Sequence, residues 1–188
     1  MGMNTRYVKE YFYKKKIRST FVWILEIIAA ILLAAIFSWF FCRSVVVQEG
    51  SMEPTLVPGE RVLMDSARYR LSSPKRGDII AFRTSEDKKA SIHIKRVIAV
   101  PGETIQIKDG QILIDGEVYK EKDEFPEITN AGLASESIKV GKGQYFVLGD
   151  NRNNSEDSRH NGMGLVDSDR IVGKLWFTIS PWKKIGFV

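Results

Sequence analysis

A chain of 188 residues with 44% hydrophobic content is long and apolar enough to fold, which argues against a disordered protein. Six of the 28 basic residues but only one of the 23 acidic residues lie in residues 1–18, which accounts for the whole net charge of +5. A neutral body behind a basic N-terminal arm argues against nucleic-acid binding and indicates a membrane surface. The single cysteine, Cys42, cannot form an internal disulfide, so the fold depends on its core.

A long apolar segment follows the basic residues. From Phe21 to Phe41 only Glu26 and Ser38 are polar, and these 21 residues in a helix extend about 31 Å, roughly the thickness of the bilayer's hydrocarbon core. A buried core helix in so small a domain would show a polar stripe. A cleaved signal peptide would have a shorter apolar core ending in a small-x-small site. We therefore predict an uncleaved transmembrane anchor.

The charge distribution also predicts a topology. Basic residues that flank a span stay in the cytoplasm. We therefore expect residues 1–18 to be a cytoplasmic segment, residues 19–42 the anchor and residues 43–188 an extracytoplasmic β-rich domain of a single-pass membrane protein. Glu26 lies near the cytoplasmic end of the span, where we expect it to pair with a basic residue or to extend to the interface.

Beyond Ser44 the apolar residues come in short runs separated by turn residues, which predicts a mainly β domain. Asp-Gly pairs at 109–110 and 115–116 separate alternating segments, and such pairs favour tight hairpins, so residues 104–119 are predicted to form a meander. Residues 120–137 are polar and acidic with little periodicity, and we expect a surface excursion with few contacts. The predicted strands are Arg61–Met64, Asp78–Phe82, Ile92–Val100, Thr104–Lys108, Gln111–Ile114, Glu117–Tyr119, Gln144–Leu148 and Ile171–Ile179.

Two segments carry the residue types of a protease with a lysine base. A serine hydroxyl is a poor nucleophile until a base takes its proton, and a lysine serves as that base only when burial holds it neutral. Ser51 lies in a turn bounded by Gly50 and Pro54, and Lys95 lies in a run expected to be a buried strand. The two residues are therefore a candidate nucleophile and its base.

A third segment, residues 149–159, is dense in hydrogen-bonding side chains. Alone it is typical of a solvated, turn-rich loop. Three motifs occur in order behind the anchor: Ser-Met-x-Pro-Thr-Leu at 51–56, Lys-Arg-Val-Ile-Ala-x-Pro-Gly-Glu at 95–103 and Gly-Asp-Asn-Arg-x-x-Ser-x-Asp-Ser-Arg at 149–159. Together with the anchor, they resemble type I signal peptidase, the membrane-bound Ser/Lys endopeptidase that removes signal peptides from exported proteins.

The resemblance implies a fold of coiled antiparallel sheets on one N-terminal transmembrane helix, in the compact form of Gram-positive enzymes. It also implies catalytic roles. Ser51 would be the nucleophile, Lys95 the general base for acylation and deacylation, and Ser155 a hydrogen-bond partner that orients the lysine amine. This arrangement follows the logic of a catalytic triad with lysine in place of histidine.

Other roles are implied outside the reacting groups. Asp157 and Arg159 would form a bracing ion pair, and Ser158 would give further polar support.

Met52, Leu56 and Ile94 would line shallow apolar pockets for the small residues at positions −1 and −3 of a signal peptide, which would lie as a strand beside the Lys95 segment. For Met52 and Ile94, ordinary core packing is the alternative.

One position departs from the family pattern. Two residues before the nucleophile, where some members have a serine that donates to the oxyanion and others have glycine, this chain has Glu49. An ionised carboxylate there would repel a developing oxyanion. Glu49 must therefore turn outward or the second donor must come from elsewhere, while the Ser51 backbone N–H remains the first donor.

The two histidines provide weaker alternatives. Strand alternation places His93 on the same face as Lys95, but a catalytic histidine there would make the lysine redundant. His160 lies in a loop with Asp150 and Asp157, but no nucleophile-elbow motif accompanies it. One cysteine and two histidines are too few for a Cys/His metal site, and no cofactor is implied.

The expected function is cleavage of N-terminal signal peptides after Ala-x-Ala-like sites through an acyl-enzyme. The expected partners are signal-peptide-bearing preproteins, the lipid bilayer and the secretion machinery. Two alternatives remain. A Ser/Lys self-cleaving regulator is disfavoured by the anchor, and a catalytically silent membrane-anchored β module that binds exported chains is disfavoured by the presence of all three catalytic residues.

Overall fold

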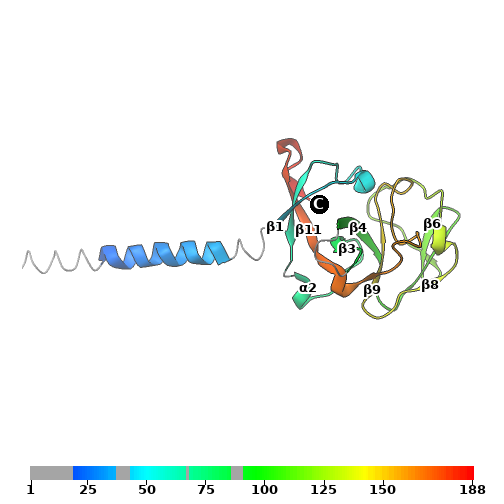
Figure 1. Ribbon diagram of the computed structural model, residues 1–188, viewed down its shortest axis with the longest axis horizontal. Coiled ribbons are helices and arrows are strands. Elements are labelled where there is room, and N and C mark those ends of the chain that lie inside the picture. Colours follow the sequence, from blue (N-terminus) through cyan, green and yellow to red (C-terminus); the bar gives the residue numbers. More distant parts are fainter. Residues whose placement is uncertain (1–18, 37–42, 67, 86–90) are drawn as a thin grey trace, which may run out of the picture. The chain divides into compact units, whose positions relative to one another are not determined.

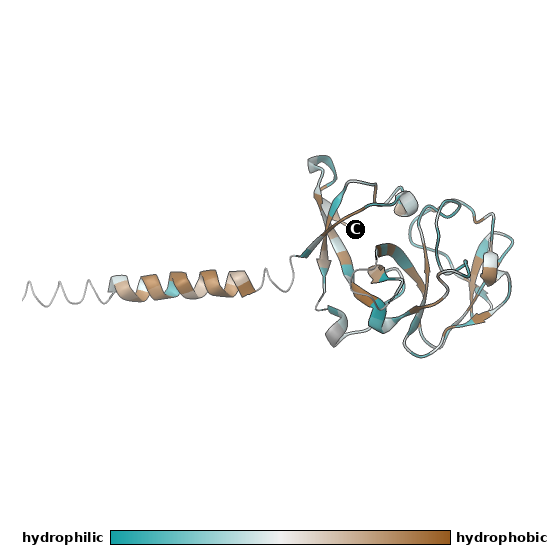
Figure 2. Ribbon diagram, viewed as in Figure 1, coloured by the Kyte–Doolittle hydropathy of each residue, from teal (hydrophilic) through white to brown (hydrophobic). Residues whose placement is uncertain are grey.

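The computed structural model describes residues 19–36, 43–66, 68–85 and 91–188, and the chain divides into two compact units, Met1–Phe40 and Phe41–Val188 (Figure 1). The first unit contains the helix Ser19–Ile36, whose 18 residues extend about 27 Å. Figure 2 shows that this helix is mainly hydrophobic, with one short hydrophilic stretch, and it is long and apolar enough to cross a membrane. Residues 1–18 and the predicted end of the anchor, residues 37–42, lie outside the described residues.

The second unit is built around a large antiparallel sheet. Its strands are ordered β1-β2-β11-β3-β4-β9-β10, and β12 pairs with β11. Segments far apart in sequence therefore lie side by side, and β4 has β3 on one side and β9 on the other. The strands are β1 (Arg43–Val46), β2 (Arg61–Asp65), β3 (Ile79–Arg83), β4 (Ile92–Ala99), β9 (Gln144–Leu148), β10 (Val166–Asp167), β11 (Ile171–Ser180) and β12 (Gly186–Phe187).

A smaller sheet has the order β7-β6-β5-β8. Its strands are β5 (Thr104–Lys108), β6 (Gln111–Ile114), β7 (Glu117–Val118) and β8 (Ile138–Lys139). Asp109 and Asp115 have φ angles of 50° and 51°, and the glycine that follows each of them also has a positive φ angle. These are the backbone angles of the tight turns that Asp-Gly pairs favour, and the predicted meander is confirmed.

The mainly β fold is confirmed, and every predicted run corresponds to an observed strand within one residue at each end. Four short strands, β1, β8, β10 and β12, were not predicted because two to four residues show too little periodicity. Short helices fill the connections: η1 (Gly50–Met52), α2 (Arg68–Leu71), η2 (Gly132–Ser135), η3 (Ser168–Arg170) and η4 (Trp182–Lys184).

Residues 120–137 are mostly exposed, as predicted for a surface excursion, but the expectation of few contacts was wrong. This segment packs against the polar loop 149–159 through ion pairs and backbone hydrogen bonds, which its polar composition did not reveal because its partners are distant in sequence. The contacting pairs are Glu121–Arg152, Glu127–Asn153, Thr129–Asn153, Asn130–Arg159 and Leu133–Arg159. Segment 120–137 therefore covers one side of loop 149–159.

Three apolar clusters form the core of the body. One of them surrounds the η1 turn and joins it to the large sheet; its members are Val47, Met52, Leu56, Val62, Met64, Ile79, Ala81, Ile94 and Leu175. Burial of these side chains fixes η1 against β4. The second cluster lies mainly in the smaller sheet and includes Phe146 and Leu148 of β9. It thereby fixes the strand that leads into loop 149–159.

Candidate active site

The turn η1 presents Ser51 in a buried position. The neighbouring Met52 is fully buried in the core. Asn151 of loop 149–159 donates two hydrogen bonds to the backbone of the turn. The backbone N–H of Asn151 donates to the Ser51 carbonyl at 3.0 Å, and its side-chain amide donates to the Gly50 carbonyl at 3.2 Å. These contacts leave Ser51 with 7% of its surface exposed. The hydroxyl is thus held in place by groups from two distant segments.

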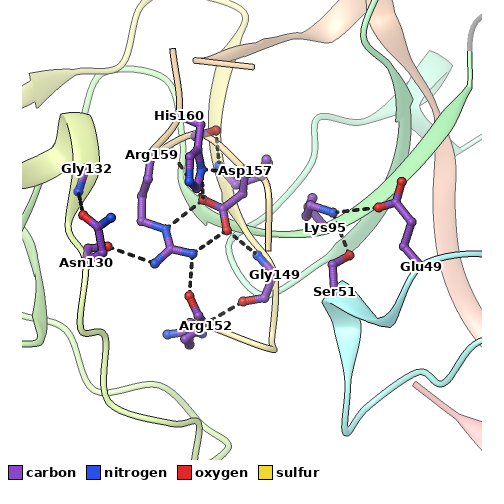
Figure 3. Close-up of polar contacts among 12 residues, drawn as sticks. Glu49, Ser51, Lys95, Asn130, Gly132, Gly149, Arg152, Asp157, Arg159 and His160 are labelled. Atoms are coloured by element: carbon purple, nitrogen blue, oxygen red, sulfur yellow. Dashed lines mark hydrogen bonds and ion pairs between the residues drawn. The ribbon is translucent and has the colours of Figure 1, made fainter. Parts of the chain in front are cut away.

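Lys95 comes to this hydroxyl from the middle of β4. Its side chain is 1% exposed, and its Nζ lies 2.7 Å from Ser51 Oγ (Figure 3). Burial lowers the pKa of the Lys95 ammonium because the charged form loses its hydration. The predicted nucleophile and base are therefore in direct contact, and the base occupies the kind of environment that favours a neutral amine.

Glu49 faces the same amine. Its Oε2 lies 3.4 Å from Lys95 Nζ, and its Oε1 lies 3.2 Å from His93 Nδ1. Glu49 therefore turns toward the base and does not point outward. It opposes the effect of burial and raises the pKa of Lys95, more strongly than the more distant Asp157 and Glu156. Alternation along β4 places His93 and Lys95 on one face of the strand. This alternation predicted from the sequence that His93 would lie near Lys95.

Ser155 is close to the nucleophile but does not make the contact that was expected. Its Oγ is buried and has no hydrogen-bond partner among the described residues, whereas the amine of Lys95 bonds to Ser51 and Glu49. The expected Ser155–Lys95 hydrogen bond is thus absent among the described contacts. A Cβ added at Gly149 would overlap the Ser155 side chain and the Ser51 carbonyl, so only glycine fits between them.

Asp157 and Arg159 form a closed ion pair beside the site. Arg159 donates from Nε to Asp157 Oδ1 and from Nη2 to Oδ2, each at 2.8 Å. Asp157 also accepts from the Gly149 N–H at 3.1 Å. Arg159 further donates to the carbonyls of Arg152 and Asn130 at 2.6 and 3.1 Å. Each charge is therefore paired and hydrogen-bonded, as burial demands.

Ser158 links the same loop to the sheet. The N–H of Val147 donates to Ser158 Oγ at 3.0 Å, and the N–H of Ser158 donates to the Val147 carbonyl at 3.1 Å. β10 pairs only with Gln144 and Tyr145 of β9. The two hydrogen bonds between Val147 and Ser158 extend the pairing of β9 beyond these residues. Ser158 thus holds loop 149–159 against β9 and has a structural role.

A second buried carboxylate, Asp150, was considered in the sequence only beside His160. Asp150 accepts from Arg96 Nε at 2.8 Å, from Arg96 Nη2 at 2.7 Å and from Thr55 Oγ1 at 2.6 Å. It thereby joins β4, the segment after η1 and loop 149–159, all of which carry motif residues. The signal was present in the sequence, because each of these three residues lies inside one of the three motifs.

A small pocket opens beside the nucleophile. Met52 and Ile94 line it, as expected, whereas Leu56 is fully buried in the core cluster and is absent from its lining. Its lining consists of four apolar residues, Val47, Met52, Ile92 and Ile94, and three polar ones, Gln48, Glu49 and Ser51. The arrangement suits a small apolar side chain next to Ser51.

The site therefore brings together a serine hydroxyl in contact with a buried lysine amine, a braced loop and a small pocket, an arrangement that suits acyl transfer by a serine. Within the described ranges, no group of three or more His, Cys, Asp and Glu residues is arranged to hold a metal ion.

Comparison with known proteins identifies the family. The sequence model of the family described as signal peptidase, peptidase S26, matches residues 20–182. The chain is 39% identical to signal peptidase I T of Bacillus subtilis (strain 168), across 92% of this chain and 91% of that protein. It is 31% identical to signal peptidase IB of Staphylococcus aureus (strain COL), across 86% and 90%.

Among solved structures, a signal peptidase I from Enterococcus faecalis V583 matches with a TM-score of 0.45 and 33% identity, across 55% of this chain and 97% of that one. The family match and the relatives extend over most of the sequence and include all three motif segments. The chain belongs to the signal peptidase family, peptidase S26, and is a membrane-anchored serine peptidase that cleaves signal peptides.

Proposed function

We propose that Ser51 is the nucleophile of this peptidase and that Lys95 is its general base. The distance of 2.7 Å between Lys95 Nζ and Ser51 Oγ carries the proposal. The neutral amine takes the hydroxyl proton as Oγ attacks the scissile carbonyl, and the resulting ammonium gives this proton to the leaving amine. Lys95 then takes a proton from water as the water oxygen attacks the acyl-enzyme, and it returns this proton to Ser51 Oγ as the signal peptide leaves with a new carboxyl terminus.

The signal peptide is proposed to bind as an added strand along β4. Residues 92–95 of β4 pair with β3, whereas pairing with β9 begins at Arg96. The other edge of 92–95 therefore has no strand partner within the part of the chain that the structure describes. An extended peptide that pairs there would run past Ser51 and present alternate side chains to the pocket.

Specificity for small residues at positions −1 and −3 is proposed to arise from this pocket. Met52 and Ile94 close it with apolar side chains, which exclude polar groups and limit the size of what enters. Leu56 supports it through the shared core cluster. Cleavage after Ala-x-Ala-like sites in preproteins follows from such a pocket.

The remaining residues are proposed to position the reacting groups. Asp157, Ser158 and Arg159 hold loop 149–159 through the contacts described above. Ser155 is proposed to orient the Lys95 amine during the reaction. Its support is the buried, unpartnered hydroxyl, because a buried polar group without a partner costs stability and calls for an explanation outside folding.

The orientation is likewise a proposal. Six basic residues among residues 1–18 precede the apolar helix, and this bias predicts a cytoplasmic segment 1–18, a bilayer-spanning segment 19–42 and an extracytoplasmic catalytic domain 43–188. Such an arrangement brings the site to the side on which exported chains emerge, where contact with the secretion machinery is also proposed.

The catalytic proposal is tested with the detergent-solubilised full chain and a precursor that contains an Ala-x-Ala site. Mass spectrometry should locate the cut directly after the second alanine, and Ser51→Ala should abolish it. Cleavage by Ser51→Ala would contradict the assignment of the nucleophile. Cleavage at unrelated positions would contradict the proposed pocket.

The topology is tested with protease added to spheroplasts that express the chain with an N-terminal tag. The body should be cut, or stay intact only where folding protects it, while the tag survives. Loss of the tag from outside would reverse the orientation.

A further inference from the structure

Glu49 occupies an unusual place for a carboxylate. It lies two residues before the nucleophile in an extended conformation, with φ −109° and ψ 146°, and both of its oxygens face β4. One lies 3.4 Å from Lys95 Nζ (Figure 3), and the other lies 3.2 Å from His93 Nδ1. A base that must be neutral is therefore in contact with the group that most favours its charged form.

The two partners differ in freedom. The Lys95 side chain is 1% exposed, whereas that of Glu49 is 48% exposed. The lysine is enclosed by the core, but the carboxylate can rotate into water at little cost. Of the two, only Glu49 can leave the contact without disturbing the fold.

Glu49 also lines the pocket beside Ser51, together with Met52 and Ile94. A small apolar side chain that enters this pocket removes water from the carboxylate, and a partly desolvated charge gains by moving out to solvent. Departure of the carboxylate also removes a negative charge from the place where the oxyanion develops, which favours the transition state. The Glu49 side chain thus links entry of the substrate to loss of the carboxylate contact at Lys95.

We propose that Glu49 is an ionic latch on the general base: its carboxylate holds the Lys95 ammonium in the free enzyme, and the signal peptide displaces it. After displacement the ammonium loses its proton to solvent, and the neutral amine then accepts the proton of Ser51. His93 keeps the latch in place from the neighbouring position on β4. The inference rests on the proposed Ser/Lys mechanism.

Other charges near the amine are more distant. On β4, His93 contacts Glu49 and not the amine. From loop 149–159, Asp157 and Glu156 raise the pKa of Lys95 through space, but Asp157 is committed to Arg159 and Glu156 makes no ion pair with Lys95 among the described contacts. Burial lowers the pKa of Lys95, and Glu49 is the strongest opposing group. Substitution of Glu49 should therefore lower this pKa further.

The test compares pH profiles of the wild type, Glu49→Gln and Glu156→Gln, all as detergent-solubilised full chains with one precursor. The profile of kcat/KM reports the free enzyme and that of kcat reports the bound complex. In Glu49→Gln the rising limb of kcat/KM should move to lower pH, with a roughly three- to tenfold gain on the limb. The limb of kcat should coincide with that of the wild type.

The matched control, Glu156→Gln, removes a nearby exposed carboxylate that does not contact the amine, and its kcat/KM limb should move less. A partly misfolded variant would scale the whole profile without moving the limb. An unmoved kcat/KM limb in Glu49→Gln would overturn the latch, and so would equal shifts of both limbs, because Glu49 would then stay on the base in the complex. Neither result affects the Ser/Lys mechanism, which activity in Lys95→Arg would overturn.

Discussion

Two ion pairs lie on opposite sides of the same site and differ in nearly every physical respect (Figure 3). Asp157 and Arg159 are both buried, and two contacts of 2.8 Å join them. Glu49 and Lys95 share one contact of 3.4 Å between a half-exposed and a fully buried side chain. The first pair is closed and fixed, whereas the second is open at one end. An ion pair with two enclosed partners holds a site in one geometry. An ion pair with one exposed partner can open, and we propose that its opening sets the charge of Lys95.

The largest expected effect comes from the open pair. Lys95→Arg keeps the charge but should reduce kcat/KM by roughly four orders of magnitude or more, because arginine stays protonated and cannot act as a base. A precursor-cleavage assay measures the loss. Lys95→Met is the matched variant, since it fills a similar volume without burying a cation, and it should be equally inactive. Substantial activity in either folded variant would remove the Ser/Lys mechanism.

The closed pair should matter most for folding. Asp157→Ala leaves the Arg159 guanidinium buried without its partner and the Gly149 N–H without an acceptor, so it should lower the free energy of unfolding by about 3–5 kcal/mol. Urea denaturation of the full chain in detergent measures this. Glu49→Gln, the equivalent change in the open pair, should cost less than about 1 kcal/mol. Similar losses in both variants would erase the distinction between the pairs.

Ser155 separates activity from stability. Ser155→Ala should reduce the rate roughly ten- to thousandfold, because it removes the group proposed to orient the base. The free energy of unfolding should stay the same or rise, since the substitution removes a buried hydroxyl that has no partner among the described residues. Parallel rate and denaturation measurements test both parts. An unchanged rate would return Ser155 to an ordinary loop position.

The smallest effect is expected where segment 120–137 supports the closed side. The Phe125 ring lies 4.4 Å from the Arg152 guanidinium and 5.2 Å from that of Arg96. Phe125→Leu keeps an apolar side chain but loses both cation–π contacts, so it should lower the free energy of unfolding by about 1 kcal/mol. Val46→Leu, at an exposed position on the edge strand β1, is the control. Equal values for the two variants would mean that the ring adds no support.

The strands and the principal residues of the site could be predicted because their signals are local. Alternation and Asp-Gly turns mark the sheets, and the motifs around Ser51 and Lys95 mark the two residues that are proposed to react. The contact between Glu49 and Lys95 was not predicted, because Glu49 carries no signal beyond its departure from the family pattern. The packing of segment 120–137 was missed for a related reason: its partners, Arg152, Asn153 and Arg159, lie some 20 to 30 residues away.

The hydrogen bond expected from Ser155 to the base shows a different limit. A motif fixes which residues meet, but the partners of each polar atom depend on the competing groups around it. Here the amine contacts Ser51 and Glu49, and no property of the 149–159 motif reveals how far Ser155 Oγ lies from it.

The pH dependence of wild-type kcat/KM tests the central claim most directly, because the proposed mechanism requires a neutral Lys95. Burial lowers the pKa of this amine, and only the deprotonated form accepts the Ser51 proton. Cleavage of an Ala-x-Ala precursor should therefore rise with pH through the lowered pKa, below the ordinary lysine value of about 10.4. A profile that is flat from about pH 5 to about pH 10, or that falls as pH rises, would contradict the mechanism.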